Sequence, residues 1–293
     1  MRVTDMTSTV LSAIWQAENN EQTALEQLST GKRVNQPSDD PTAAAEDVLN
    51  LSQQAQVAQY TQTTGSLNGL FQTADSAIGS VITALNQAVS VGTEASSGTL
   101  SASDQQAAAA SIQSVLDQVV QLANTSYEGS YIFGGTEVGS APFSSGANGV
   151  TYSGDDGVNQ ATIAEGLTIS TNVPGSQLFM QPGSDVIGSL EQLVTAVQNG
   201  DTTAASDATT AVSNALGYLN SQRVFYGNAM SQVNNEQTDL SQETTNLQSQ
   251  ENTLVGVDMA QAATNLTQAQ TDDQAVLEAA AKVLPMTLLD YLK

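Results

Sequence analysis

The residues that most enzymes use for acid–base and nucleophilic chemistry are largely missing from this sequence. It has no histidine and no cysteine, so the usual general base and the usual thiol nucleophile are absent. Ser29 and Lys32 have the Ser-x-x-Lys spacing of some acylating enzymes, but they span an expected helix end. Thr30-Gly31-Lys32 lacks the upstream glycine and the trailing Ser or Thr of a phosphate-binding loop. We therefore expect a turn here and no enzyme activity.

Metal and cofactor sites are equally poorly supported. Adjacent carboxylates occur at Asp39-Asp40, Asp155-Asp156 and Asp272-Asp273. None of these pairs has the alternating oxygen ligands and the terminal Glu of a calcium loop. The glycines within 129–135 miss the dinucleotide-binding spacing and predict a loop with positive φ. We expect no cofactor and no metal, and we assign the three acidic pairs to helix capping, a turn and a solvated helix face.

The composition favours long helices over a bulky globular core. Of the 293 residues, 40% are hydrophobic but only 4% are aromatic, which is typical of helices with seams of small residues. A formal net charge of -24 repels phosphate backbones, so we expect no nucleic-acid partner. We find neither a cleavable signal peptide nor a run of about 18 apolar residues, and we expect no membrane insertion.

Heptad spacing predicts one long helix in the C-terminal half. From Ala205 to Leu254, spacings of three and four alternate without a slip, and every seventh residue is apolar. A 3.5-residue repeat held over about seven heptads is typical of coiled-coil packing. Upstream stripes predict its partner helices, together with a helix at 185–198 and a capping box from Ser103 and Gln106. These stripes are Ala44, Val48, Leu51, Ala55 and Ala58; Leu67, Phe71, Ala74, Ile78, Val81, Leu85 and Ala88; and Ala108, Ile112, Val115, Val119 and Leu122.

The middle of the chain changes character. Gly, Ser, Asn and Pro punctuate residues 138–182 and predict short strands at 150–152, 161–164 and 167–171. About 45 residues are marginal for an independent core. The segment is therefore either a small β subdomain that leans on the helices or part of a larger, interrupted one, and we expect it to project into solvent.

The two ends of the chain carry narrow apolar stripes on otherwise polar helices. Each stripe is too thin to stabilise a lone helix in water, so we expect the two ends to pair with each other only within an assembly. The alternative is that they complete the bundle of a single chain. Trp15 is expected at an interface or seam, and Pro285 is expected to kink the last helix or end it early. The predicted assembly interface is Met6, Val10, Ile14, Leu28, Leu266, Val276, Val283, Leu288, Leu289 and Leu292.

The residues after the first helix predict a turn that leads directly into the next helix. Gly31 can take a positive φ at the helix end, and Asp40 followed by Pro41 is a good N-cap and first-turn pair. This stretch resembles the N-terminal motif of bacterial flagellin-like proteins, and both the helix that opens at Asp258 and the Leu-Leu-Asp-Tyr-Leu ending resemble the C-terminal motif. The matching residues are Leu28, Ser29, Gly31, Arg33, Asn35, Asp39 and Asp40, with Arg223 in the long helix. Tyr131, Ile132, Phe133, Gly134 and Gly135 resemble the hook–filament junction branch of that family.

The resemblance implies a mainly α fold with a small β insert, in which both halves of the chain form a coiled-coil-like helical bundle. The expected segments are an assembly helix and corner at 1–40, bundle halves at 41–130 and 183–257, a β-rich insert at 131–182 and a second assembly helix at 258–293. It further implies a self-assembling, exported extracellular subunit of the flagellum, whose neighbours are hook-associated protein 1 and flagellin and which meets a type III export chaperone first. A short filament flagellin, or an adhesin carried by the insert, remains open.

Overall fold

The computed structural model describes residues 2–146 and 149–291, with side chains for 8–146 and 149–282. Contacts divide the chain into two compact units, Met1–Val57 with Gln242–Lys293, and Ala58–Ser241. Two long helices, α2 (Pro41–Ser96) and α6 (Thr202–Val255), each contribute to both units. They run antiparallel, because Asn50 of α2 meets Leu247 of α6, whereas Asp75 meets Arg223. Within the described residues, no helix combines the length and the apolarity that a membrane span requires.

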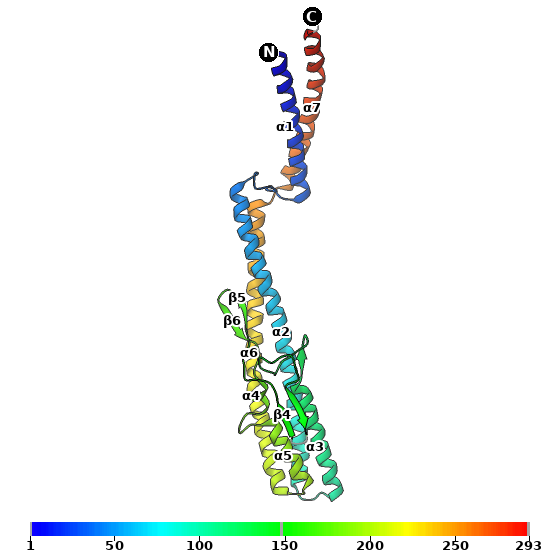
Figure 1. Ribbon diagram of the computed structural model, residues 1–293, viewed down its shortest axis with the longest axis vertical. Helices are drawn as coiled ribbons and strands as arrows, with labels where there is room; N and C mark the ends of the chain where they lie inside the picture. The colour runs from blue at the N-terminus through cyan, green and yellow to red at the C-terminus, as the bar shows by residue number, and fades with distance from the viewer. Residues whose placement is uncertain (1, 147–148, 292–293) are drawn as a thin grey trace. The chain divides into compact units, whose positions relative to one another are not determined.

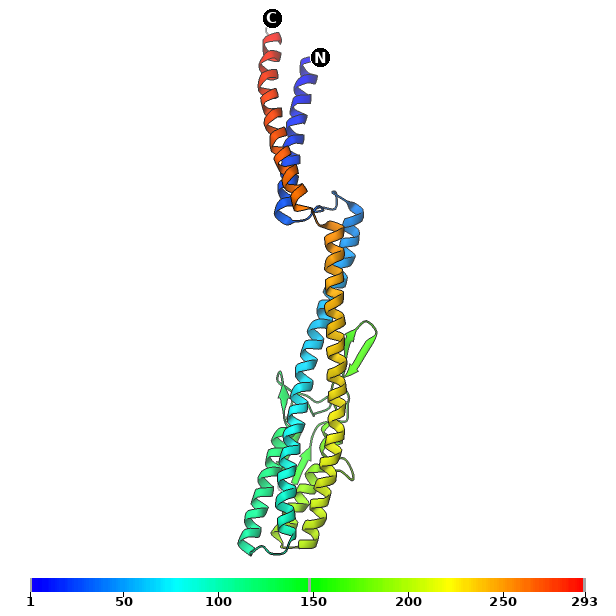
Figure 2. The same ribbon diagram turned by 180° about the vertical axis from the view of Figure 1, so that it is seen from behind.

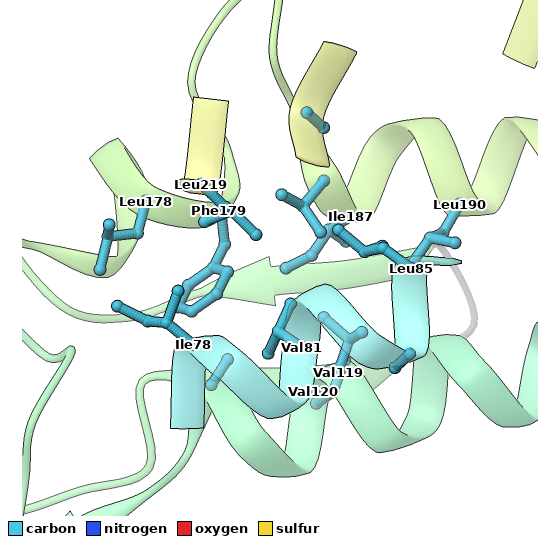
Figure 3. Close-up of a cluster of buried hydrophobic side chains, with 14 of the residues drawn as sticks. Ile78, Val81, Leu85, Val119, Val120, Leu178, Phe179, Ile187, Leu190 and Leu219 are labelled. Atoms are coloured by element: carbon cyan, nitrogen blue, oxygen red, sulfur yellow. The ribbon is translucent and has the colours of Figure 1, made fainter. Parts of the chain in front are cut away.

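The second unit, Ala58–Ser241, holds the large hydrophobic core. Parts of α2 and α6 pack there with α3 (Ala102–Ala123), α4 (Gly175–Phe179) and α5 (Val186–Gln198), and Figures 1 and 2 show α3 and α5 beside the two long helices. Apolar side chains from all five helices meet in the core (Figure 3). They include Ile78, Val81 and Leu85 of α2, Val119 and Val120 of α3, Leu178 and Phe179 of α4, Ile187 and Leu190 of α5, and Leu219 of α6.

The heptad pattern of α6 is confirmed by burial. Its seventh-residue positions from Ala205 to Leu247 are all buried, and Leu254 is half-buried. The stripe predicted for α3 also faces the core. The capping box predicted at Ser103 is wrong, however, because α3 begins at Ala102 and Ser101 is its N-cap. The hydroxyl of Ser101 accepts a hydrogen bond from the backbone N–H of Asp104 at 3.3 Å, so the same motif lies two residues earlier.

Three separate antiparallel hairpins lie within residues 126–170, and the first of them begins before the predicted insert at 131–182. They are formed by β1 (Ser126–Tyr127) with β2 (Ser130–Tyr131), β3 (Phe143–Gly146) with β4 (Gly149–Tyr152), and β5 (Gln160–Ala164) with β6 (Leu167–Ser170). The three strands expected from the sequence correspond to β4, β5 and β6. The predicted turn at Asn148-Gly149 falls partly on residue 148, which lies outside the described residues.

Aromatic side chains of the insert join the hydrophobic core of the helices. Phe179 of α4, which lies within the insert, packs edge to face on Phe133 and on Phe143, with ring centroids 5.3 and 5.6 Å apart. All three rings are buried in one cluster with side chains of α2, α3, α5 and α6. A small set of hairpins cannot bury enough surface to form a core of its own. The insert is therefore stabilised by packing against the helices, and it does not form an independent projecting subdomain.

The first unit pairs the two ends of the chain. Helices α1 (Arg2–Thr30) and α7 (Met259–Tyr291) lie side by side in both views (Figures 1 and 2). Pro285 was expected to kink the last helix or to end it early. The early end is wrong, since α7 continues to Tyr291, and the kink stays a prediction. A proline removes one helical N–H, and the neighbouring turns of this long helix retain theirs.

One predicted stripe of α2 is wrong. Ala44, Val48, Leu51, Ala55 and Ala58 were expected to face the bundle, yet Val48 is 65% exposed and Leu51 is 44% exposed. Only Ala44 among the five is half-buried. The seam with α6 instead uses the neighbouring face of the helix, including Ala43 and Asn50. Polar pairing on that face, described below, overrides the apolar spacing.

Two glycines in the long helices of the second unit predict opposite effects of alanine. A Cβ at Gly92 would strike Thr209 and come within 3.1 Å of Leu193, whereas a Cβ at Gly217 would meet nothing within 4 Å. We expect Gly217→Ala to raise the free energy of unfolding by about 0.5–1 kcal/mol through helix propensity. Gly92→Ala should lower it by about 1–3 kcal/mol through overpacking. Urea unfolding followed by circular dichroism measures both, and equal effects would contradict the packing described here.

Candidate assembly site

In the first unit, backbone hydrogen bonds join the segment that connects α1 to α2 with the segment that connects α6 to α7. We call these two segments the joint (residues 31–40 and 255–258). The N–H of Arg33 donates to the carbonyl of Val255 at 2.6 Å, and the N–H of Val257 donates to the carbonyl of Gly31 at 3.0 Å. Gly31 has φ +70°, a conformation that glycine adopts without steric cost. The joint therefore holds the connection between α1 and α2 against the connection between α6 and α7.

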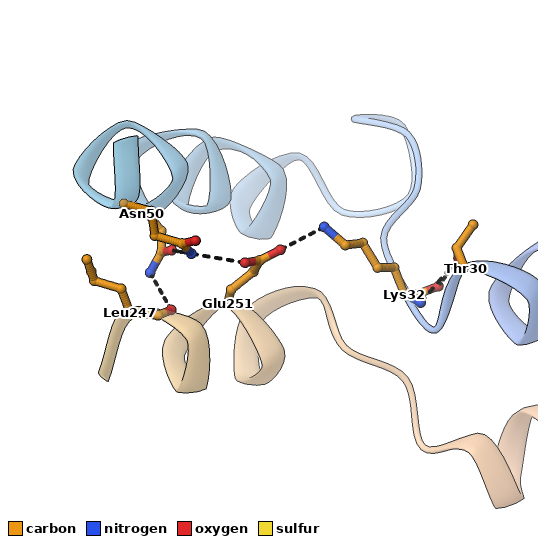
Figure 4. A network of polar contacts seen from close by, with 6 residues as sticks. Thr30, Lys32, Asn50, Leu247 and Glu251 are labelled. Carbon is orange, nitrogen blue, oxygen red and sulfur yellow. Dashed lines mark hydrogen bonds and ion pairs between the residues drawn. The ribbon is translucent and has the colours of Figure 1, made fainter. Parts of the chain in front are cut away.

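An ion pair reinforces the joint (Figure 4). The Nζ of Lys32 lies 2.8 Å from Oε1 of Glu251, and the side chain of Gln54 donates to Oε2 of Glu251 at 2.9 Å. These hydrogen bonds favour the charged carboxylate, so the pKa of Glu251 lies below its ordinary value. The pKa of Lys32 is raised, chiefly by its hydrogen bond to Glu251.

A second cluster of polar contacts starts α2. The guanidinium of Arg33 donates to Oδ2 of Asp40 at 3.2 Å and to the carbonyl of Leu254 at 2.9 Å. The other carboxylate oxygen of Asp40 accepts the N–H of Ala43 at 3.1 Å, which is the N-cap predicted from the sequence. The pKa of Asp40 is lowered, first by that backbone hydrogen bond. Arg33 thus links the cap of α2 to the end of α6.

The remaining residues of the N-terminal motif shape the turn itself. Oδ2 of Asp39 accepts the N–H groups of Asn35 and Gln36 at 3.0 and 2.9 Å, and the amide of Asn35 donates to the carbonyl of Lys32 at 3.0 Å. Leu28 is half-buried and Ser29 is exposed. The motif therefore builds the joint, and both carboxylates of the Asp39-Asp40 pair are occupied by capping and turn contacts.

The seam between α2 and α6 in the first unit is polar. Asn50 is only 4% exposed, and its side-chain amide donates to the carbonyl of Leu247 at 3.1 Å (Figure 4). Gln54 donates to the amide oxygen of Asn50 at 2.6 Å. A shift of either helix by one residue would separate the side-chain amide of the buried Asn50 from its α6 partners, the carbonyl of Leu247 and the side chain of Gln250, and a buried polar group without a partner is costly. Asn50 therefore specifies the register of the two helices.

The predicted assembly stripes face each other across the α1–α7 pair of a single chain. Small residues form the buried line, with Ala17 and Ala24 on α1 and Ala262, Ala269 and Ala280 on α7. The two ends are therefore in contact within one chain; that they become stably ordered only in an assembly stays a prediction. The larger predicted residues Val10, Ile14, Leu28, Leu266 and Val276 are half-buried, and Met6, Val283, Leu288, Leu289 and Leu292 lie outside the residues whose side chains are described.

A second apolar stripe on α1 remains in solvent, and we call it the α1 outer stripe (Leu11, Trp15 and Leu25). These side chains are 54%, 63% and 56% exposed. Sequence reasoning singled out Trp15 but missed Leu11 and Leu25. The available signal was that each of the three follows directly after a residue of the predicted stripe, so α1 has two adjacent apolar lines and α7 covers only one.

The motif around residues 131–135 is structural. Tyr131 lies half-buried in β2, whereas Ile132, Phe133, Gly134 and Gly135 are buried. Gly135 has φ +76°, and its carbonyl accepts hydrogen bonds from the amides of Asn159 and Asn172 at 3.0 and 3.2 Å. These contacts hold the hairpins together and leave no open loop for a ligand.

Arg223, the residue of the family motif in the long helix, forms an ion pair with Asp75. Its Nε and one terminal nitrogen donate to the two carboxylate oxygens of Asp75, both at 2.7 Å. This fork geometry connects α2 and α6 in the second unit. The guanidinium side chain is 40% exposed, so the pair stabilises the fold only modestly.

The other two acidic pairs also have structural partners. Asp155 accepts the backbone N–H groups of Thr136 and Gly157 at 2.6 and 3.0 Å, and these hydrogen bonds, with one from the Thr136 hydroxyl, lower its pKa. The carboxylate of Asp272 accepts from Gln268 at 2.8 Å on the surface of α7. Across the described parts of the chain, no group of three or more potential ligands could hold a metal ion.

These features define a class of protein: a mainly α-helical chain whose two ends pair and leave one apolar stripe exposed. Models of the bacterial flagellin N-terminal and C-terminal helical regions match residues 4–138 and 209–292. The chain therefore belongs to the bacterial flagellin-like family.

Curated relatives point to one branch of that family. Flagellar hook-associated protein 3 of Salmonella typhimurium LT2 is 36% identical over 163 residues, which are 55% of this chain and 51% of that protein. The Escherichia coli K12 protein of the same name is 43% identical over 120 residues, or 41% and 38% of the two chains. The matches thus span about half the length of the curated relatives or less.

Solved structures share the fold. A putative flagellar hook-associated protein from Vibrio parahaemolyticus aligns with a TM-score of 0.69 at 17% identity, covering 74% of this chain and 99% of that one. FlgL from Bacillus cereus aligns with a TM-score of 0.61 at 24% identity, covering 70% and 99%. At these identities the likeness shows the fold alone.

The charge state of Glu251 makes the joint sensitive to acid. Because its pKa is lower in the folded chain, the stabilisation from Glu251 is complete above the unfolded pKa near 4.3 and is lost as pH falls through the folded pKa. We expect Glu251→Gln to cost about 0.5 kcal/mol or less at pH 7, after solvent screening of this partly exposed pair. The cost should vanish in acid. Urea unfolding from pH 3 to pH 7 tests this, with the exposed Glu243→Gln on the same helix as the control.

Proposed function

We propose that this chain is a structural subunit of the bacterial flagellum that forms the junction between hook and filament by self-assembly through its terminal helices. The observation that carries the proposal is the α1 outer stripe, where Leu11, Trp15 and Leu25 are each more than half exposed. Exposed apolar stripes of this kind mark surfaces that another protein covers. The names of the curated relatives support the flagellar setting.

The architecture suggests how such a subunit works. Pairing α1 with α7 buries mainly alanines, which contribute little apolar area, so the pair is weakly held in a free chain. A neighbouring copy that covers the α1 outer stripe would add the missing burial. The predicted interface residues at the extreme ends, including Met6 and Leu288, would lie in the same contact region. Subunits arranged around a shared axis would then form a ring or tube.

The proposed place of the subunit between hook and filament also implies its binding partners. Hook-associated protein 1 would contact the subunit on the cell-proximal side, and flagellin would contact it distally. A cytoplasmic export chaperone would hold the chain before type III export, and the exported subunit would be extracellular. The chain has no cysteine, so its fold would not depend on the redox state of either compartment.

Electron microscopy of purified flagella with antibody against this chain tests the location. We expect the label to collect in one short band between hook and filament. Label along the whole filament would indicate a filament flagellin instead. A deletion of the 138–182 insert that abolished adhesion but left motility intact would favour the adhesin alternative.

The α1 outer stripe can be tested by substitution. Trp15→Gln with Leu25→Gln should weaken self-association by about tenfold or more, because buried aromatic anchors dominate interface energy. Sedimentation velocity over a concentration series measures the effect. Val158→Gln, at a side chain 48% exposed in the insert, is the matched control and should associate like the parent chain. Unchanged association of the double variant would refute the role of the stripe.

A further inference from the structure

Asparagine is followed directly by glycine at Asn68, Asn148 and Asn199. An Asn-Gly pair is the sequence in which an asparagine side chain most readily loses ammonia, because glycine has no side chain to hinder attack by its own backbone nitrogen. Asn148 lies outside the described residues. The other two asparagines belong to the second unit, and the structure places them in opposite environments.

Asn68 is held inside a long helix. The Asn68-Gly69 pair lies in the interior of α2, where backbone N–H groups are held by intrahelical hydrogen bonds. The side-chain amide of Asn68 donates to Oδ1 of Asn234 at 3.2 Å, and its side-chain oxygen accepts from Gln72 at 3.1 Å. The ring of Tyr127 lies so close to Gly69 that a Cβ there would strike it. Reaction at Asn68 therefore requires α2 to open.

Asn199, in contrast, is exposed at the end of a helix. It is the C-cap of α5, and Gly200 after it has φ +67°. The N–H of Gly200 donates to the carbonyl of Val197 at 3.2 Å, and the N–H of Asp201 donates to the carbonyl of Ala196 at 3.0 Å. This pair of bonds is the Schellman motif that ends many helices at a glycine. Among the described residues, no side-chain hydrogen bond holds the amide group of Asn199.

We propose that Asn199 is a site of spontaneous deamidation, at which the folded chain slowly gains a carboxylate. The backbone nitrogen of Gly200 attacks Cγ of Asn199 and closes a succinimide ring. The side-chain amide nitrogen leaves as ammonia and carries away the proton that the Gly200 nitrogen loses. Water then opens the ring at either of its two carbonyls, which leaves aspartate or isoaspartate. The reaction needs only the chain and water, so it goes beyond the proposed function and does not depend on it.

The cost of opening separates the two sites. Attack at Asn199 requires the N–H of Gly200 to leave the carbonyl of Val197, which breaks the last turn of α5 and leaves the rest of the helix in place. Helix ends open at a lower free energy than helix interiors. The reacting atoms are joined through one residue, so attack is intramolecular and needs no other reactant once the turn is open.

The aspartate product places a charge where it is unfavourable. Asp201 already caps α6 by accepting its first backbone N–H groups, and Glu191 and Asp207 line the same groove as Asn199. A new carboxylate at 199 would lie at the C-terminus of α5, where the helix dipole disfavours anions, and near like charges that repel it. Deamidation therefore weakens the end of α5.

Isoaspartate alters the backbone as well. It adds a methylene group to the main chain inside the Schellman motif, so the two hydrogen bonds of that motif lose their geometry. The same turn packs against the other end of the bundle helices: a Cβ at Gly200 would come within 3.1 Å of Gln105 in α3, and a Cβ at Gly98 would meet Thr202 at 3.5 Å. The modification thus changes the place where the α2–α3 and α5–α6 turns meet.

Peptide mass spectrometry of the full chain, after incubation in mildly alkaline buffer, measures deamidation at each asparagine. Asn68 is the matched control within the same chain, because it has the same glycine neighbour. We expect Asn199 to deamidate at least about tenfold faster than Asn68 in the folded chain, because opening α2 costs more free energy. In concentrated urea, where only the local sequence acts, the two rates should converge.

Two results would overturn the assignment. One is an equal rate of deamidation at Asn199 and Asn68 in the folded chain. The other is an Asn199 that reacts in urea but stays intact in the folded chain, because the Schellman motif would then protect it. Neither result bears on the proposed self-assembly, which is measured separately.

Substitution tests the consequence of the reaction. Asn199→Asp reproduces the aspartate product and should lower the midpoint of urea unfolding, because it places the charge at the end of α5. Asn228→Asp adds the same charge at an exposed position in the interior of α6 and should leave the midpoint close to that of the parent chain. Equal midpoints for the two variants would contradict the weakening of α5.

Discussion

The unequal distribution of large apolar side chains between the two units determines how each unit is stabilised. The second unit collects Phe71, Phe133, Phe143 and Phe179 with many aliphatic residues in one buried cluster. Among the described side chains of the first unit, the buried apolar residues are Val34, Ala43, Leu247 and Val255, together with the alanine lines of α1 and α7. Hydrophobic burial is the main driving force for folding, so it stabilises the second unit more than the first, in which hydrogen bonds and ion pairs contribute a larger share.

Polar contacts in the first unit therefore do two things. Lys32 with Glu251, Arg33 with Asp40, and the backbone bonds between Gly31 and Val257 fix the joint. The buried Asn50 sets the register of α2 against α6. The consequence is that Val48 and Leu49 face solvent. A unit held in this way keeps apolar surface available for other molecules, which suits a subunit that is completed by its neighbours.

The fold was largely predictable, because long periodic stripes identify helices well. Asp185 and Asp258 cap helices at the places where the sequence predicted helices to begin, and the stripes of α3, α5 and α6 face the core. What spacing alone could not decide was which of two faces of α2 meets α6. The apolar stripe through Val48 and Leu51 was the natural choice from the sequence, but the side-chain hydrogen bonds of Asn50 and Gln54 are long-range contacts that periodicity does not contain. The second stripe of α1 was overlooked for a similar reason, since helical spacing identifies a stripe without identifying its partner.

Hydrogen–deuterium exchange of the full chain at low concentration tests the central claim most directly. Exchange reports local opening free energy residue by residue. The account predicts slow exchange in α2 around 71–88 and in α3, together with much faster exchange along α1 and α7, which should become slow when the chains assemble. Protection of α1 and α7 in the isolated chain equal to that of the second unit would contradict it, because the ends would then be stable without neighbours.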